Sequence, residues 1–158
     1  MFLAIADALA ARLQAEQAPG GTLEDVRLVR VGDHQPIPTL HHPAVVVDWD
    51  GARAFRADRQ RVEFSAVFQV YLYTVSQEGP EAAEREADRL VWDDTSGTPR
   101  GLLPALCRCT RTALVVGGQS YLLAIGDEVH TVAVKDKSHS TGMSWVEVRA
   151  VTMRNAPT

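Results

Sequence analysis

The sequence has little of what several protein classes require. Its two cysteines, Cys107 and Cys109, are too close along the chain to bridge each other, so we expect no disulfide framework and a reducing compartment. No stretch approaches the roughly 18–20 apolar residues that cross a bilayer, so no membrane partner is expected. The apolar start, Met1–Leu13, lacks a basic beginning and is interrupted by Asp7 and Arg12. It predicts a helix rather than a secretory signal.

Positive charge is also scarce. The chain has 16 Lys and Arg against 20 Asp and Glu, a formal net charge of −4. Binding to nucleic acid over the whole surface depends on neutralising phosphates with basic side chains, so this balance argues against it. A mildly acidic surface does suit a protein that nucleic acid passes without sticking.

The usual catalytic motifs are missing. Neither Ser65 nor Ser120 has the flanking glycines of a nucleophile elbow, and Gly117-Gly118 is not followed by the Gly-Lys-Ser/Thr of a phosphate loop. His130 stands alone in a strand pattern, and the carboxylates of Glu81–Glu86 alternate with arginine, which favours ion pairing. We therefore predict no catalytic residue, no cofactor and no enzymatic activity.

One group of residues has the ligand types of a metal site. His41, His42, Asp48 and Asp50 offer the imidazole and carboxylate groups that zinc or iron accept. Adjacent histidines in an extended segment point in opposite directions, however. A solvated loop followed by carboxylates at a strand end is the simpler interpretation, so we predict no metal site and keep these four as weak candidates.

Helical and strand patterns occur in separate blocks. The expected helices are Phe2–Gln17, Glu81–Trp92 and a short one from a Thr98-Pro99 cap to about Cys107. The expected strands are Val26–Val31, Ala44–Trp49, Val62–Val75, Thr112–Val116, Ser120–Ile125, Val129–Val134 and Ser144–Met153. This order predicts an α+β fold, with a mainly antiparallel sheet and the helices packed on one face. No linker divides the chain, so residues 1–158 are predicted to form a single domain.

Two features fix further details of the expected sheet. Val62–Val75 is the longest alternating segment and carries aromatic residues on both faces toward its end, so it should be central. Asp50-Gly51 follows a β-branched segment and predicts a turn there.

An arginine cluster is the first candidate partner interface. Arg53, Arg56, Arg59 and Arg61 flank Phe55 in an expected connection between strands. Guanidinium groups there could contact phosphate or an acidic partner. The alternative is a solvated hairpin tip.

Two polar loops are further interface candidates, because loops on a rigid sheet carry recognition. Gly32–Pro43 contains three prolines and no periodicity. Lys135–Gly142 supplies Lys135, Lys137 and His139.

The layout resembles the tail-terminator, or tail-completion, proteins of long-tailed bacteriophages and the related head–tail joining proteins. The resemblance covers the N-terminal helix Phe2–Gln17, a Pro-Ala-Val-Val-Val strand at Pro43–Val47 and the Val-Tyr-Leu-Tyr strand end at Val70–Tyr73. It continues in the Glu-Ala-Ala-Glu-Arg-Glu-Ala helix at Glu81–Ala87 and in paired C-terminal strands ending at Val151. It is one of pattern, and no residue carries over as a functional site.

The resemblance implies a structural virion protein in the tail or neck, assembled in the host cytoplasm. Its subunits would form a ring, expected to be a hexamer, between the tail tube protein and the head connector, with DNA passing through the lumen. Two alternatives remain open: a monomeric protein-interaction adaptor, and a small metal- or ligand-binding enzyme domain.

Overall fold

The computed structural model describes residues 2–32, 37–135 and 138–155, without the side chains of residues 50, 52–55 and 153–155. Its helices are α1 (Phe2–Ala15), α2 (Pro80–Val91), α3 (Leu102–Cys109) and the short 3-10 helix η1 (Thr39–His41). Its strands are β1 (Leu28–Val31), β2 (Ala44–Ala57), β3 (Arg61–Ser76), β4 (Leu114–Val116), β5 (Gln119–Lys135) and β6 (Ser140–Asn155).

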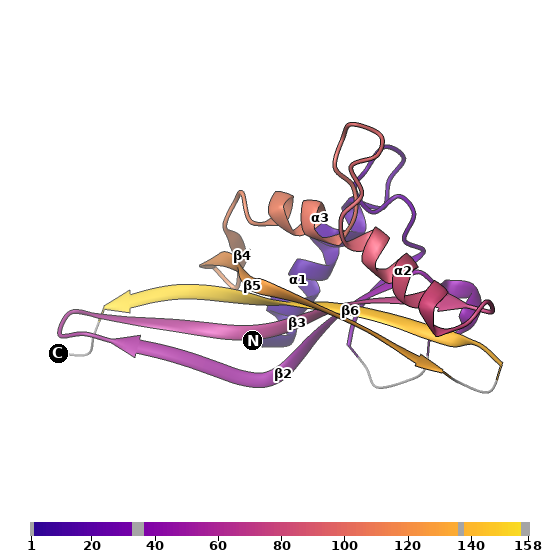
Figure 1. Cartoon of the computed structure of the whole chain (residues 1–158). Coiled ribbons are helices and arrows are strands. Elements are labelled where there is room, and N and C mark those ends of the chain that lie inside the picture. Colours follow the sequence, from indigo (N-terminus) through magenta and orange to yellow (C-terminus); the bar gives the residue numbers. More distant parts are fainter. Residues whose placement is uncertain (1, 33–36, 136–137, 156–158) are drawn as a thin grey trace.

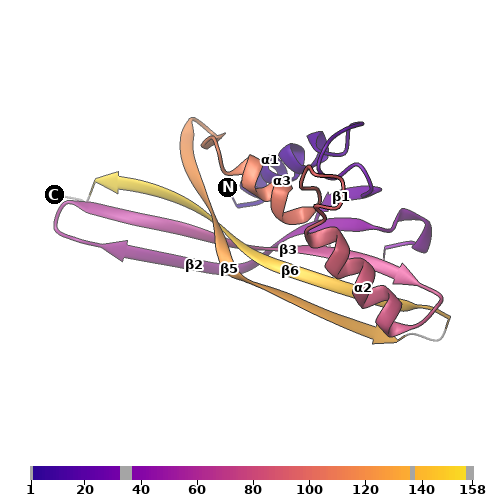
Figure 2. The ribbon, with the colours of Figure 1, turned by 45° about the horizontal axis from the view of Figure 1, so that its top comes forward.

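The strands form one six-stranded sheet in the order β1-β2-β3-β6-β5-β4. All neighbours are antiparallel except β1 and β2. The three α-helices lie on the same side of this sheet (Figure 1), and the view in Figure 2 agrees. The predicted α+β fold, with a mainly antiparallel sheet and helices on one face, is therefore confirmed.

The core forms between the helices and one face of the sheet. In α1, Ile5, Leu9 and Leu13 recur every four residues, which places them on one helix face, and all three are fully buried. In β3, Phe68 is fully buried with its alternate neighbours on the same face. The other side of the sheet has no α-helix against it (Figure 1).

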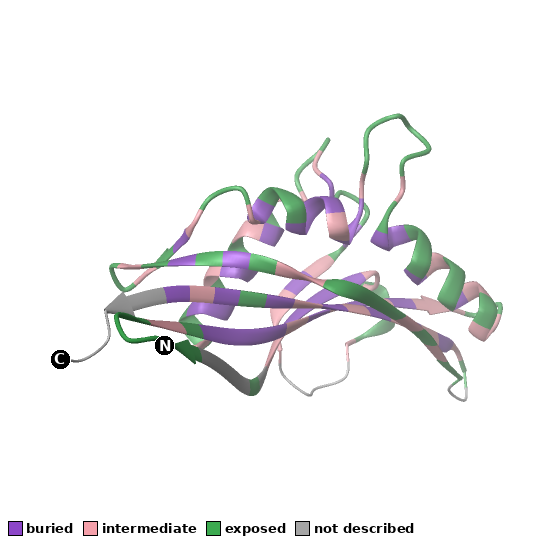
Figure 3. Ribbon diagram, turned by 60° about the vertical axis from the view of Figure 1, so that its left-hand side comes forward, coloured by how far each residue is buried: buried purple, intermediate pink, exposed green. Residues whose placement is uncertain are grey.

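The ends of β2, β3 and β6 extend past the helices. We call this extension the arm; it comprises residues 53–57, 61–66 and 150–155. Ala57 pairs with Val62, and Arg61 pairs with Asn155, so the arm remains three-stranded to its end. In Figure 3 buried residues gather where the helices cover the sheet, and exposed residues mark the hairpin end.

The predicted turn at Asp50-Gly51 is wrong, because β2 continues through it. The register with β3 shifts between Trp49 and Arg53, and Gly51 has a φ of 81°. A glycine in this left-handed conformation accommodates a bulge that bends the strand without reversing it.

Two other boundaries differ from expectation. The predicted Thr98-Pro99 cap is wrong: Arg100 pairs with Asp93 through two backbone hydrogen bonds of 2.8 and 2.9 Å, so α3 begins after Gly101. The two strands predicted at 120–125 and 129–134 are one strand, β5, which is interrupted by a register shift between Ile125 and Val129. No described helix is long and apolar enough to cross a membrane.

Replacing Phe68 by alanine should lower the free energy of unfolding by about 3–5 kcal/mol, because it leaves a cavity under the helices. The matched control is Phe64→Ala on the same strand, where the ring is 45% exposed and its loss should cost far less. Chemical denaturation of both variants tests this, and equal losses would contradict the assignment of the core.

Candidate functional site

An aromatic strip crosses the sheet face that the helices leave open. It consists of Tyr71 and Tyr73 on β3, Trp145 on β6 and His130 on β5. Trp145 lies directly opposite both Tyr71 and His130 in the strand register. The ring centroids are 6.2 Å apart for Tyr71–Trp145, 5.0 Å for His130–Trp145 and 5.8 Å for Tyr71–Tyr73. Burial, and next the neighbouring Tyr71 hydroxyl, raise the pKa of Tyr73, so this phenol is neutral at ordinary pH.

Exposed apolar side chains extend the aromatic strip. Val132 pairs with Met143 on the same face and is 38% exposed, and Val134, two residues along, is 60% exposed. Single exposed valines are ordinary, but contiguous aromatic and apolar groups on one sheet face are typical of a surface that binds another protein. No catalytic chemistry is needed to explain this face.

An acidic hollow of about 170 Å³ adjoins the strip. It forms at the register shift in β5, where residues 126–128 bulge opposite Glu147 on β6. Its lining comprises Gln69, Gly126, Asp127, Glu128, His130, Trp145 and Glu147.

The carboxylates of this acidic hollow are only partly neutralised. Glu128 lies 3.3 Å from the His130 Nε2 atom, and Glu147 accepts a hydrogen bond of 2.6 Å from Arg149. Within the described part of the chain, Asp127 has neither a hydrogen bond nor an ion pair. The hollow thus combines an exposed negative charge with the wall of an indole ring.

The opposite charge gathers at the end of the β2–β3 hairpin. Arg56, Arg59 and Arg61 are all exposed there, and we call them the arginine tip. Asp58 closes the turn: its carboxylate accepts hydrogen bonds of 2.7 Å from the backbone N–H groups of Gln60 and Arg61. These two bonds, followed by the nearby arginines, lower the pKa of Asp58. The predicted connection over Arg53–Arg61 is too long: residues 53–57 continue β2 and Arg61 begins β3, so only residues 58–60 form the hairpin turn. The Arg53 side chain lies outside the described part.

The second basic candidate lies at the other end of the sheet. Lys135 ends β5 opposite Ser140, and His139 lies beside it in the loop to β6. The register of β6 puts Ser140 and Asn155 at opposite ends, about 50 Å apart at roughly 3.3 Å per residue. Lys137 lies outside the described residues. The arginine tip and this loop therefore cannot act as one site within one chain.

The weak metal candidates are not brought together. His41 and His42 lie at the end of η1, and Asp48 follows six residues after His42 along extended backbone, about 20 Å away. Asp50 has no described side chain. Among the described residues, no three His, Cys, Asp or Glu side chains are placed to hold a metal ion.

The two cysteines are free, as expected from their spacing. Cys107 is exposed on α3, whereas Cys109 is buried in the core. Burial, with a smaller contribution from Glu16, raises the pKa of the Cys109 thiol to about 11. Cys109 is therefore a packing residue and not a nucleophile at neutral pH.

The acidic hollow is the feature that sequence reasoning missed. Gly126, Asp127 and Glu128 looked like a loop between two strands, when they are a bulge within one. The sequence does carry a signal for the bulge, though not for the hollow that the bulge forms with β6: alternation breaks for only these residues and resumes at Val129. No protein-family model matches this sequence, and no curated protein matches it either.

Alkylation should separate the two thiols. The folded chain should take up one iodoacetamide at Cys107 and a second only after denaturation, because Cys109 is buried and protonated. Mass spectrometry of wild type and of Cys107→Ser measures this. Rapid native labelling of the Cys107→Ser variant would contradict the burial of Cys109.

Acid should loosen the hairpin tip. Because the pKa of Asp58 is lowered in the closed turn, the open turn binds the proton more readily. The stabilisation is therefore present above the ordinary aspartate pKa of about 3.9 and is lost as the pH falls through the lowered value. The protection of the Gln60 and Arg61 amides, taken as their exchange rate by NMR relative to that of an unstructured peptide at the same pH, should fall between about pH 6 and about pH 2.

The matched controls for this titration are two substitutions at the same position. Asp58→Asn keeps an acceptor oxygen and should make the protection of these amides independent of pH, while Asp58→Ala should show little protection at any pH. Protection in Asp58→Ala equal to that of wild type would show that the carboxylate does not hold the turn.

Proposed function

We propose that the protein is a structural subunit that self-associates into a ring, and that this ring terminates a phage tail tube and joins it to the head connector. The observation that supports self-association is the aromatic strip on a sheet face that carries no α-helix. Tyr71, Trp145 and His130 form a continuous strip across three adjacent strands there. Contact with another protein surface would remove these exposed aromatic and apolar groups from water, which favours association.

The placement at a phage tail rests on the order of the elements. An N-terminal helix, a Pro-Ala-Val-Val-Val strand, a long central strand, a Glu- and Ala-rich helix and paired C-terminal strands follow one another. This is the order that the resemblance to tail-terminator proteins rests on. The net charge of −4 suits a lumen through which DNA passes without binding. The proposed partners are further copies of the chain, in a hexamer, together with the tail tube protein and the head connector.

Native mass spectrometry and negative-stain imaging over a range of concentrations test this proposal. The expected result is a closed ring whose lumen admits duplex DNA, roughly 20 Å wide given a major groove of some 12 Å. If the protein stays monomeric and binds one unrelated host protein, the ring proposal is overturned and the alternative of a monomeric interaction adaptor is favoured.

A pair of tryptophan variants tests whether the sheet face takes part. Trp145→Ser should shift the assembly toward monomer, because it removes the centre of the aromatic strip. Trp92→Ser is the matched control, since Trp92 is 48% exposed and follows α2 on the helix side. Equal effects of the two changes would argue against the aromatic strip as the contact.

A further inference from the structure

The arginine tip and the acidic hollow carry opposite charges on one rigid sheet. The arginine tip presents Arg56, Arg59 and Arg61 to solvent, and the hollow presents Asp127 and Glu128. Strand alternation also places Arg61 on the same face of β3 as Gln69, which lines the hollow. Each surface therefore has the charge that the other needs.

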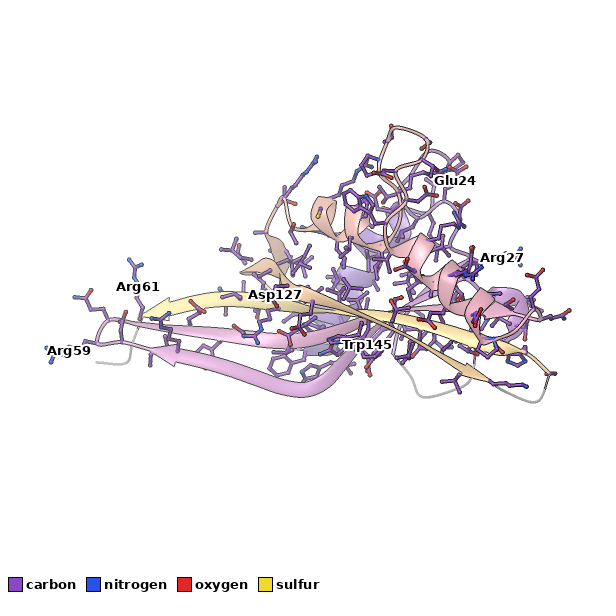
Figure 4. The ribbon with its side chains drawn as sticks, viewed as in Figure 1. Glu24, Arg27, Arg59, Arg61, Asp127 and Trp145 are labelled. Atoms are coloured by element: carbon purple, nitrogen blue, oxygen red, sulfur yellow. The ribbon has the colours of Figure 1, made fainter. Side chains whose placement is uncertain are left out.

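The arginine tip cannot reach the hollow of its own chain. Arg61 lies eight residues from Gln69 along β3, which is about 26 Å at roughly 3.3 Å per residue. The arm is paired on both sides of β3, so it cannot fold back across the sheet. Figure 4 shows Arg59 and Arg61 at the far end of the sheet, well away from Asp127 and Trp145. Contact between these surfaces therefore requires two copies.

The chemistry of the acidic hollow suits a guanidinium group. Carboxylates bind the planar guanidinium through paired charge-assisted hydrogen bonds. The indole of Trp145 also lines the hollow, and although its ring already packs against His130 and Tyr71, it gives the carboxylates an apolar boundary that strengthens a charge-assisted bond. Asp127 has no partner among the described residues, so one carboxylate is available without breaking an existing pair.

A larger acidic hollow, of about 450 Å³ beside α2, is the competing acceptor. It is lined by Glu81, Glu84, Arg85, Asp88 and Thr131. Arg85 already supplies positive charge there, at 3.8 Å from Glu81, and none of the described residues that line this hollow is aromatic. The hollow at Asp127 is therefore the better match.

We propose that the arginine tip of one copy docks into the acidic hollow of a neighbouring copy. The proposal rests on the self-association proposed above and names the surfaces that make the contact. The tip and the hollow are different surfaces of each chain, so the contact is heterologous, and repetition about an axis closes such contacts into a ring.

Charge reversal tests the contact. The tip variant is Arg59→Glu with Arg61→Glu, and the hollow variant is Asp127→Lys with Glu128→Lys. Each variant alone should weaken association at least tenfold at low salt, as measured by sedimentation. An equal mixture of the two should restore assembly, because the reversed tip then meets the reversed hollow and the native tip meets the native hollow.

Two double variants are matched controls. Arg85→Glu with Arg111→Glu carries the charge change of the tip variant at exposed positions elsewhere. Glu81→Lys with Glu84→Lys makes the same change in net charge as the hollow variant, and it also tests the competing hollow beside α2 as an acceptor. Neither should change association, and circular dichroism confirms that all variants fold.

The outcomes separate this inference from the proposed function. A ring that is indifferent to both reversals overturns the docking contact and leaves the ring proposal intact. Restoration by mixing that yields dimers or open filaments supports the contact and counts against the ring. A wild-type chain that stays monomeric at low salt and high concentration overturns the contact.

Discussion

The pairing of β3 with β2 on one side and β6 on the other is the constraint on which the rest of the structure depends. Along β3, alternate residues such as Phe68 face the helices, while Gln69 and Tyr71 face the open side. The same strand therefore builds the core and displays the aromatic strip. A slip of one residue would exchange these two faces, so burial of the core fixes the position of the strip.

Close contacts fix the positions of the helices on their face of the sheet. A Cβ atom on Gly142 of β6 would lie 2.1 Å from the Ala83 carbonyl oxygen, so only glycine allows α2 this close. Thr74 of β3 also donates a hydrogen bond of 2.7 Å to that carbonyl. Arg12 of α1 donates hydrogen bonds of 2.7 and 2.6 Å to the carbonyls of Cys109 and Ala113, which ties α1 to the end of α3. With the helices held on one face, the aromatic strip on the other remains without a helix.

The sequence predicted what depends on local periodicity and failed where long-range register decides. The alternation of Val62–Val75 identified the central strand, and the helical spacings identified α1 and α2. The third helix was predicted from a Thr98-Pro99 cap, and its start was therefore misplaced. The acidic hollow could not be predicted, because Asp127 meets Glu147 and Gln69 only through the pairing of β5, β6 and β3. The weak metal candidates show the limit of closeness along the chain: His42 and Asp48 are six residues apart, yet extended backbone separates them. Pairing register, which one sequence does not reveal, accounts for the hollow that was missed.

The third strand of the arm stiffens the hairpin that carries the arginine tip. A two-stranded hairpin alone is marginally stable in water, and a flexible one would lose much conformational entropy on docking. Pairing of β3 with β6 as far as Arg61 and Asn155 makes the arm three-stranded, and Asp58 closes the turn beyond it. The arginines are therefore held at a fixed distance from the acidic hollow before any partner arrives. Because this rigidity keeps the two surfaces of one chain apart, the proposed contact between them requires a second copy.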